Sequence, residues 1–227
     1  MNYFDLIKKT AVYLKFREPK AFDDNHSYIY EIKLLLNSVL KEICSTFPWQ
    51  FRKTFIEINT ESGVSEYNSP GELISLKING QTLSLLYTYN EDFQNYDSSS
   101  GVPREFIDAN GKFILYPTPG NVYTVKIDYY TNLFAVNNEG LPKLEMDLET
   151  DSPIIPVQFQ DVLVWGACRD YKGDPGKGKY IHFQNKFAQL FGEMRKAHRQ
   201  DVNASPVLEF GNSVSSNQDL IRRFYLY

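Results

Sequence analysis

Residues 73–86 read LISLKINGQTLSLL, two apolar runs on either side of the dipeptide Asn79-Gly80. An Asn-Gly pair accepts the positive φ angles of a type I′ turn, so this stretch predicts a tight β-hairpin. Residues 104–108 and 112–116 repeat the pattern around Asn110-Gly111 and predict a second hairpin. The middle of the chain is therefore expected to form an antiparallel sheet.

Two more strands extend this sheet. Residues 51–58 begin irregularly and alternate between apolar and polar side chains at their end, whereas residues 122–130 alternate throughout. Because successive side chains of a strand point to opposite faces, the second run places one apolar set on a single face. That set is Tyr123, Val125, Ile127 and Tyr129. About six strands joined by short turns are typical of an antiparallel sandwich or a small barrel.

Amphipathic helices are predicted on both sides of the sheet. Asn2 is placed to cap a first helix that stops before Pro19, and Ser27 to cap a second that extends to about Thr46. The apolar face of the second helix is formed by Ile29, Ile32, Leu36, Val39, Leu40 and Ile43, widened by Leu34 and Leu35. A third helix is predicted from about 156 to 171 and a fourth from about 177 to 199. The apolar face of the fourth carries Tyr180, Phe183, Phe187, Leu190, Phe191 and Met194.

These elements predict an α+β protein with a four-helix domain that is formed by both chain ends, residues 1–49 and 153–200. An antiparallel β-sandwich or barrel-like domain, residues 50–152, is inserted between the second and third helices. Residues 137–151 are expected to be a polar loop. Residues 201–227 form an extended C-terminal tail, in which a stretch rich in Ser and Asn, 205–218, precedes an apolar and basic end.

The end of the tail is the candidate functional site. An apolar cluster behind a polar linker is expected to dock on a partner, because a chain end normally frays. Docking back on the same subunit is the alternative. The docking residues are Leu220, Ile221, Arg222, Arg223, Phe224, Tyr225, Leu226 and Tyr227.

Composition narrows the class of partner. The 227 residues carry a net charge of −4 and 15% aromatic residues, and no basic stripe of the kind that grips nucleic acid is visible. One modest basic cluster comprises Arg195, Lys196, His198 and Arg199. No apolar run approaches the roughly 18 residues that span a bilayer, and the chain opens directly into a helix pattern. We therefore expect a soluble protein without a membrane partner.

The sequence signals for a catalytic, phosphate-binding or metal site are weak. Cys44 and Cys168 lie in apolar helical patterns and are expected to be free, buried thiols of a reducing compartment. Residues 173–178 distantly resemble a phosphate-binding loop but lack its preceding strand and its Ser or Thr. The three histidines, His26, His182 and His198, have no partners at metal-ligand spacing.

The acidic residues of the loops, Asp23, Asp24, Asp147, Glu149 and Asp151, are expected to be solvated. No catalytic residue, cofactor or metal is predicted, and we expect no enzymatic activity. A pair of carboxylates for glycoside hydrolysis stays open, since its members need only be close in space.

Several local patterns recur along the chain. Phe47-Pro48-Trp49 follows the second helix, and residues 67–73 read YNSPGEL. The later patterns are GVPREF at 101–106, FILYPTP at 113–119, the strand 122–130 and IIPV at 154–157. Together they resemble the adaptor proteins of tailed bacteriophages, including the tail tubular protein A group, and the resemblance covers roughly residues 25 to 200.

The resemblance implies a structural virion protein that is assembled in the host cytoplasm. About twelve copies would form a head-to-tail connector ring below the portal, with helices on the portal and β domains towards further tail proteins. The C-terminal extension would grip the portal. Closure of such a ring needs two complementary, different patches on each subunit. A net-negative lumen would let DNA pass without specific binding.

A virion or surface module with a carbohydrate-binding β domain is the alternative. Tyrosine rings stack well on sugars because they combine an apolar face with a polar tip. The candidates for such stacking are Tyr87, Tyr89, Tyr96 and Tyr116.

Overall fold

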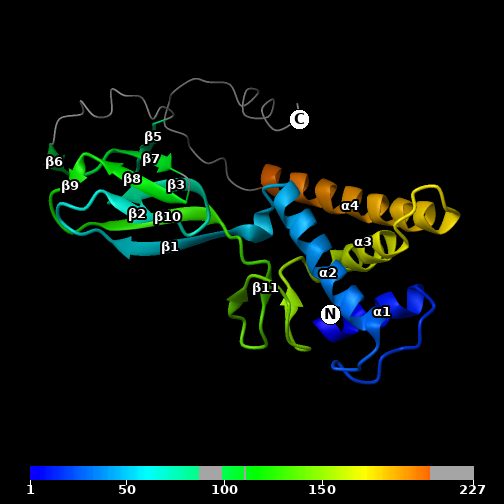
Figure 1. Cartoon of the computed structure of the whole chain (residues 1–227). Helices are drawn as coiled ribbons and strands as arrows, with labels where there is room; N and C mark the ends of the chain where they lie inside the picture. Colours follow the sequence, from blue (N-terminus) through cyan, green and yellow to red (C-terminus); the bar gives the residue numbers. More distant parts are fainter. Residues whose placement is uncertain (87–98, 110, 205–227) are drawn as a thin grey trace.

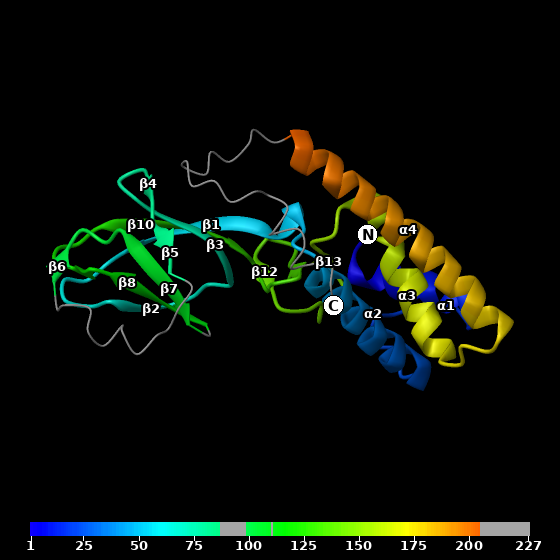
Figure 2. The same ribbon diagram turned by 90° about the horizontal axis from the view of Figure 1, so that it is seen from above.

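The computed structural model describes residues 1–86, 99–109 and 111–204. Figures 1 and 2 show two bodies arranged along one axis, a β body and a helical body, joined where the chain first enters and later leaves the β body. The mixed α+β class is as predicted. No helix in the described ranges is long and apolar enough to cross a membrane.

The β body is a sandwich of two four-stranded sheets. In the first, β1 (Lys53–Asn59) pairs with β10 (Thr124–Tyr130), followed by β3 (Glu72–Ile78) and β4 (Gln81–Thr82). In the second, the order is β2 (Glu66–Asn68), β8 (Lys112–Tyr116), β7 (Glu105–Ala109) and β5 (Ser84–Leu85). Their inner faces share one core of Leu76, Ile78, Leu83, Phe106, Phe113, Leu115, Val125 and Ile127. Two short strands, β6 (Ser100–Gly101) and β9 (Thr118–Pro119), form a separate parallel pair.

The first predicted hairpin is present, but its second strand divides. Asn79 and Gly80 have φ angles of 52° and 78°, as the turn requires. Residues 81–82 pair with β3, whereas β5 crosses to the other sheet and runs parallel to β7. Leu83, between them, is buried in the shared core, and this burial carries the chain from one sheet to the other. The second hairpin, β7–β8, forms as predicted, with Gly111 at φ 87°.

The helical body contains four α-helices: α1 (Tyr3–Tyr13), α2 (Ser27–Thr46), α3 (Asp161–Lys172) and α4 (Gly178–Ala204). Asn2 caps α1 as predicted, since its side chain accepts a hydrogen bond from the backbone N–H of Asp5 at 2.8 Å. The cap predicted at Ser27 is wrong. Ser27 is already helical, and the cap position belongs to His26, whose ring stacks on Tyr28 instead of capping.

The predicted bounds of the later helices need adjustment. Residues 157–159 form a separate 3-10 turn, η3 (Val157–Phe159), because Pro156 precedes them in an extended conformation, and α3 begins only at Asp161. α3 ends at Lys172, capped by Gly173 with its φ of 57°, so the residues that follow connect two helices. Leu34 is 54% exposed and lies off the buried face of α2.

A small sheet, β12-β11-β13, belongs to the helical body. It consists of β11 (Ala135–Val136), β12 (Pro142–Lys143) and β13 (Ser152–Pro153). The helical core includes four buried side chains from this region, Phe134, Ala135, Met146 and Ile155. Residues 137–151 are thus packed against helices. We propose, on this packing, that the inserted β domain ends near Thr131 and that residues 132–152 fold with the helices.

Candidate functional site

The predicted chemical groups are dispersed. Cys44 and Cys168 are free and buried in the helical core, as expected, and burial raises the pKa of both thiols to about 12. They are therefore protonated and poor nucleophiles at neutral pH. His26 and His182 are exposed, whereas His198 is buried beside Trp49. Within the described ranges no group of three or more His, Cys, Asp or Glu residues is placed to hold a metal ion.

Arg52 is the central residue of the junction between the two bodies. It closes the short helix η1 (Gln50–Arg52), and its side chain is 4% exposed. Its guanidinium donates to the carbonyl oxygens of Cys44 at 2.7 Å and Thr131 at 3.0 Å, and to Asn132 Oδ1 at 3.3 Å. One side chain thus ties the end of α2 to the strand that leaves the β body. The backbone N–H of Thr131 returns a hydrogen bond to the carbonyl oxygen of Arg52 at 2.9 Å.

Electrostatic contacts surround the same guanidinium. Glu72, at the start of β3, lies 3.8 Å away, and the rings of Tyr130 and Phe134 lie 5.7 and 5.5 Å from the guanidinium carbon. A guanidinium near aromatic rings is attracted electrostatically to the negative faces of the rings, and the attraction is strongest where water is excluded. These contacts hold Arg52 from several sides. The two bodies are therefore connected by specific side-chain contacts as well as by the two chain segments that pass between them.

An aromatic cluster lies beside this joint. Trp49 is fully buried, donates from Nε1 to the carbonyl oxygen of Ile43 at 2.7 Å, and stacks on Phe51. His198 reaches the cluster from α4, where its Nδ1 accepts a hydrogen bond from the backbone N–H of Gln50 at 3.3 Å. Arg195 lies over the ring of Phe47. The basic cluster predicted on α4 therefore packs, in part, against the junction.

A shallow polar groove of about 530 Å³ lies next to Arg52. Two carboxylates line it, Glu72 and Asp108. Glu72 is engaged by Arg52, whereas burial raises the pKa of Asp108. Because one of the two carboxylates is held in a structural ion pair, the described part of the groove gives no support to a hydrolytic pair of the kind that glycoside cleavage requires.

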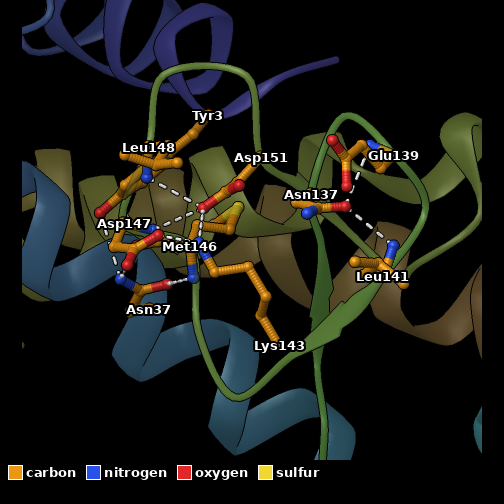
Figure 3. A network of polar contacts seen from close by, with 10 residues as sticks. All are labelled: Tyr3, Asn37, Asn137, Glu139, Leu141, Lys143, Met146, Asp147, Leu148 and Asp151. Carbon is orange, nitrogen blue, oxygen red and sulfur yellow. Dashed lines mark hydrogen bonds and ion pairs between the residues drawn. The ribbon is translucent and has the colours of Figure 1, made fainter.

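The acidic segment 137–151, termed the leucine loop here, is organised by Asp151 (Figure 3). This residue is fully buried, and the expectation that it is solvated is wrong. Its Oδ2 accepts hydrogen bonds from the backbone N–H groups of Asp147 and Leu148, both at 2.9 Å, and from Lys143 Nζ at 2.7 Å. Burial opposes ionisation of this carboxyl, but the hydrogen bonds from Lys143, Leu148 and Asp147 outweigh it and lower the pKa of Asp151 to about 2.

Two asparagines order the leucine loop, Asn37 from α2 and Asn137 within the loop itself (Figure 3). Asn37, on α2, binds both backbone groups of Met146: Nδ2 donates to its carbonyl oxygen at 2.8 Å, and Oδ1 accepts from its N–H at 3.1 Å. Asn137 Oδ1 accepts from the N–H groups of Glu139 and Leu141. The loop also caps α1, because the Tyr3 N–H donates to the carbonyl oxygen of Asp151 at 2.7 Å.

This framework presents apolar side chains to solvent. Leu141, Leu144 and Leu148 are 56%, 63% and 56% exposed, although the loop that carries them is fixed by the hydrogen bonds of Asp151 and Asn37. Exposed acidic side chains lie between and beside them, at Glu139, Glu145, Asp147 and Glu149. Ordered backbone that displays leucines among carboxylates is suited to binding another protein, because exposed apolar side chains on a fixed frame lose little entropy on binding.

Most residues of the predicted site fall outside the described ranges. This applies to the whole docking cluster, Leu220, Ile221, Arg222, Arg223, Phe224, Tyr225, Leu226 and Tyr227, and to Tyr87, Tyr89 and Tyr96. Tyr116, at the end of β8, is half-buried. Sequence reasoning missed Arg52 and Asp151; for Arg52, its place beside the Phe47-Pro48-Trp49 motif was the available signal.

A comparison with protein families identifies the chain. The family model described as SU10 adaptor protein matches residues 1–209, which is most of the 227-residue chain. The chain belongs to this family and is a structural adaptor protein of a bacteriophage. No curated protein matches the chain. The narrower resemblance to the tail tubular protein A group stays a prediction.

Proposed function

Starting from membership in the SU10 adaptor protein family, we propose that this chain is a subunit of the ring that joins the capsid portal to the tail. The family match is the observation that carries the proposal. About twelve copies form the ring, as the resemblance to phage connectors implies. The ring acts as a structural part of the virion, and no catalytic step is required of it.

The two-body architecture suits a connector. The helical body faces the portal and the β body faces the tail proteins. A connector has to hold its two partners at a fixed distance, and the contacts of Arg52 with Cys44, Thr131 and Asn132 support such stiffness. The leucine loop lies on the helical body close to the junction, where it is available to a neighbouring protein (Figure 1).

The apolar end of the chain, residues 220–227, docks on the portal in this proposal. Its sequence combines two arginines with six large apolar or aromatic side chains in a short stretch. Aromatic residues and arginine are enriched where protein partners bind most tightly. DNA passes through the channel without specific binding, in keeping with the net charge of −4.

The test is to mix the purified chain with the portal of the same phage and to look for rings by electron microscopy. Two variants accompany the full chain. One is truncated after Ser216, and the other keeps the length and composition of residues 220–227 in a scrambled order. If the full chain forms rings on the portal and neither variant does, both the connector role and the docking of the tail are supported.

Each other outcome has a separate meaning. Rings with all three proteins would retain the connector role and refute docking of the tail. Rings with the scrambled variant but not with the truncated one would show that composition suffices. If none of the three proteins forms rings on the portal, the connector proposal is refuted.

A further inference from the structure

The strand β1 is an edge strand with a long open side. It pairs with β10 along all seven residues from Lys53 to Asn59, and within the described ranges no strand pairs with its other side. Figure 1 shows it along the margin of the β body. The side chains of residues 54–57 are all exposed. Phe55 is 58% exposed, and Ile56 is 40% exposed.

Edge strands are normally protected against pairing with another chain. The usual devices are a proline, a bulge, a short length, charged side chains, or a covering helix or loop. β1 contains no proline, and its register with β10 is unbroken. The single shift in this sheet lies between β10 and β3, on the far side. A long edge that has neither proline nor bulge and displays an exposed aromatic residue is suited to adding a further strand whose charges match its own.

The charges on β1 identify the strand that it fits. Lys53 and Glu57 lie on the same face as Phe55, two residues before and two residues after it. If a second β1 runs antiparallel with Phe55 opposite Phe55, then Lys53 of each copy lies opposite Glu57 of the other. Opposite charges and aromatic pairs directly across two strands are stabilising. The strand is therefore complementary to itself in one register.

We propose that the free protein forms a two-fold dimer in which β1 pairs with β1 of a second copy, centred on Phe55. A shift of the register by two residues would place Lys53 opposite Phe55 and lose both ion pairs. A shift by one residue would put the two charged sets on opposite faces. The observed alternation thus selects a single pairing.

The arrangement of the bodies leaves room for this pairing. In both views β1 runs along the long axis of the molecule, and the helical body lies beyond its Lys53 end (Figures 1 and 2). Because the two strands are antiparallel, the helical bodies of the two copies extend in opposite directions. They do not meet across the paired edge.

This contact is separate from the ring of the proposed function. A two-fold contact uses the same patch on both copies and closes at two, whereas a ring of identical subunits uses two different patches. The dimer covers the open edge before assembly. One pair of strands buries a small area, so we expect a weak dimer, with a dissociation constant on the order of 10 µM or weaker.

The test is sedimentation equilibrium of the full chain over a concentration series. Lys53→Glu and Glu57→Lys each place like charges opposite each other at both ends of the pairing, and each should raise the dissociation constant about tenfold. An equal mixture of the two single variants restores opposite charges at both positions and should form a mixed dimer. Lys20→Glu and Glu18→Lys, at exposed sites of the helical body, are the controls.

Thermal unfolding of each variant shows that the β body remains folded, which matters because Glu57 lies across from Lys126. The proposal is overturned if the protein stays monomeric at all concentrations, if neither reversal weakens the dimer, or if the mixed variants fail to associate. The portal assay is independent of these results. A connector without a β1 dimer and a β1 dimer without connector activity are therefore distinguishable.

Discussion

Arg52 donates a 2.7 Å hydrogen bond to the carbonyl oxygen of Cys44, in the last turn of α2. Arg52 directly precedes β1 in the β body, and its guanidinium thus caps the C-terminal end of α2 in the helical body. The carbonyl oxygens at the end of a helix have no partner within it, and a cation is favoured there. This contact makes the position of the β body depend on the end of α2.

Replacing Arg52 tests this joint. Arg52→Met removes three hydrogen bonds from a buried cation and leaves their acceptors without partners, so the free energy of unfolding should fall by about 3 kcal/mol. Urea unfolding measures the loss, and small-angle scattering should show a broader range of shapes. Arg104→Met, at an exposed site of the β body, should change stability by less than about 0.5 kcal/mol. Equal losses for the two variants would contradict the role of Arg52.

Acid should weaken the protein through Asp151. The pKa of this carboxyl in the folded protein is about 2, below its ordinary value of 3.8. Its contribution is therefore present above about pH 4 and is lost as the pH falls towards 2, for a total of about 2 kcal/mol. Unfolding free energies measured at neutral pH and near pH 3 should differ by about half of this total. In Asp151→Asn the acid-dependent part should shrink, whereas Glu149→Gln, at an exposed site, should leave it unchanged.

Close packing of α3 on α2 depends on Gly166. A Cβ at this position would lie 2.5 Å from Val39 Cγ1 and 3.2 Å from Phe187 Cδ2. Gly166→Ala should therefore destabilise the protein by about 1–3 kcal/mol, although alanine favours helix. Gly192→Ala on α4 is the matched control, since nothing lies within 4 Å of its added Cβ, and it should be neutral or stabilising.

A second variant shows that the clash is with Val39. In a Val39→Ala background the additional cost of Gly166→Ala should be smaller, because the methyl group that it meets is gone. Thermal or urea unfolding of the four proteins gives this coupling. An additive result would place the clash elsewhere.

Asn37 should control the order of the leucine loop. Asn37→Ala removes both hydrogen bonds to the backbone of Met146, so the amides of residues 139–149 should exchange faster with solvent. Hydrogen exchange followed by mass spectrometry measures this locally. Ser38→Ala, at the neighbouring exposed position, is the control. Unchanged protection in Asn37→Ala would mean that Asp151 alone orders the loop.

Local signals in the sequence were sufficient for much of the fold. The Asn79-Gly80 turn, the cap at Asn2 and the helical stripes depend on neighbours within a few residues, and the structure contains them. The division of the hairpin at Leu83 was missed, because the partner of β5 is a strand some twenty residues later. The end of the third helix, predicted near residue 171, lies at Lys172.

The candidate site was less accessible to such reasoning. Arg52 binds groups on both sides of the β body's insertion, and the distance along the chain between Arg52 and Thr131 is 79 residues. No local sequence pattern around Arg52 or Thr131 predicts that the two residues are in contact. Asp151 resembled any acidic loop residue, because its burial depends on α1 and α2 covering the loop. The terminal cluster, 220–227, stays a prediction for its part.

The two chain crossings between the bodies have an evolutionary consequence. Lys53 and Tyr130, the first and last strand residues of the excursion, are directly paired neighbours in adjacent strands, so the ends of the inserted segment lie about 5 Å apart. A segment with adjacent ends can be exchanged for another of different length without moving the helices that remain. Related chains are thus free to acquire a different β domain by exchange of this segment, while the helical body keeps its own core intact.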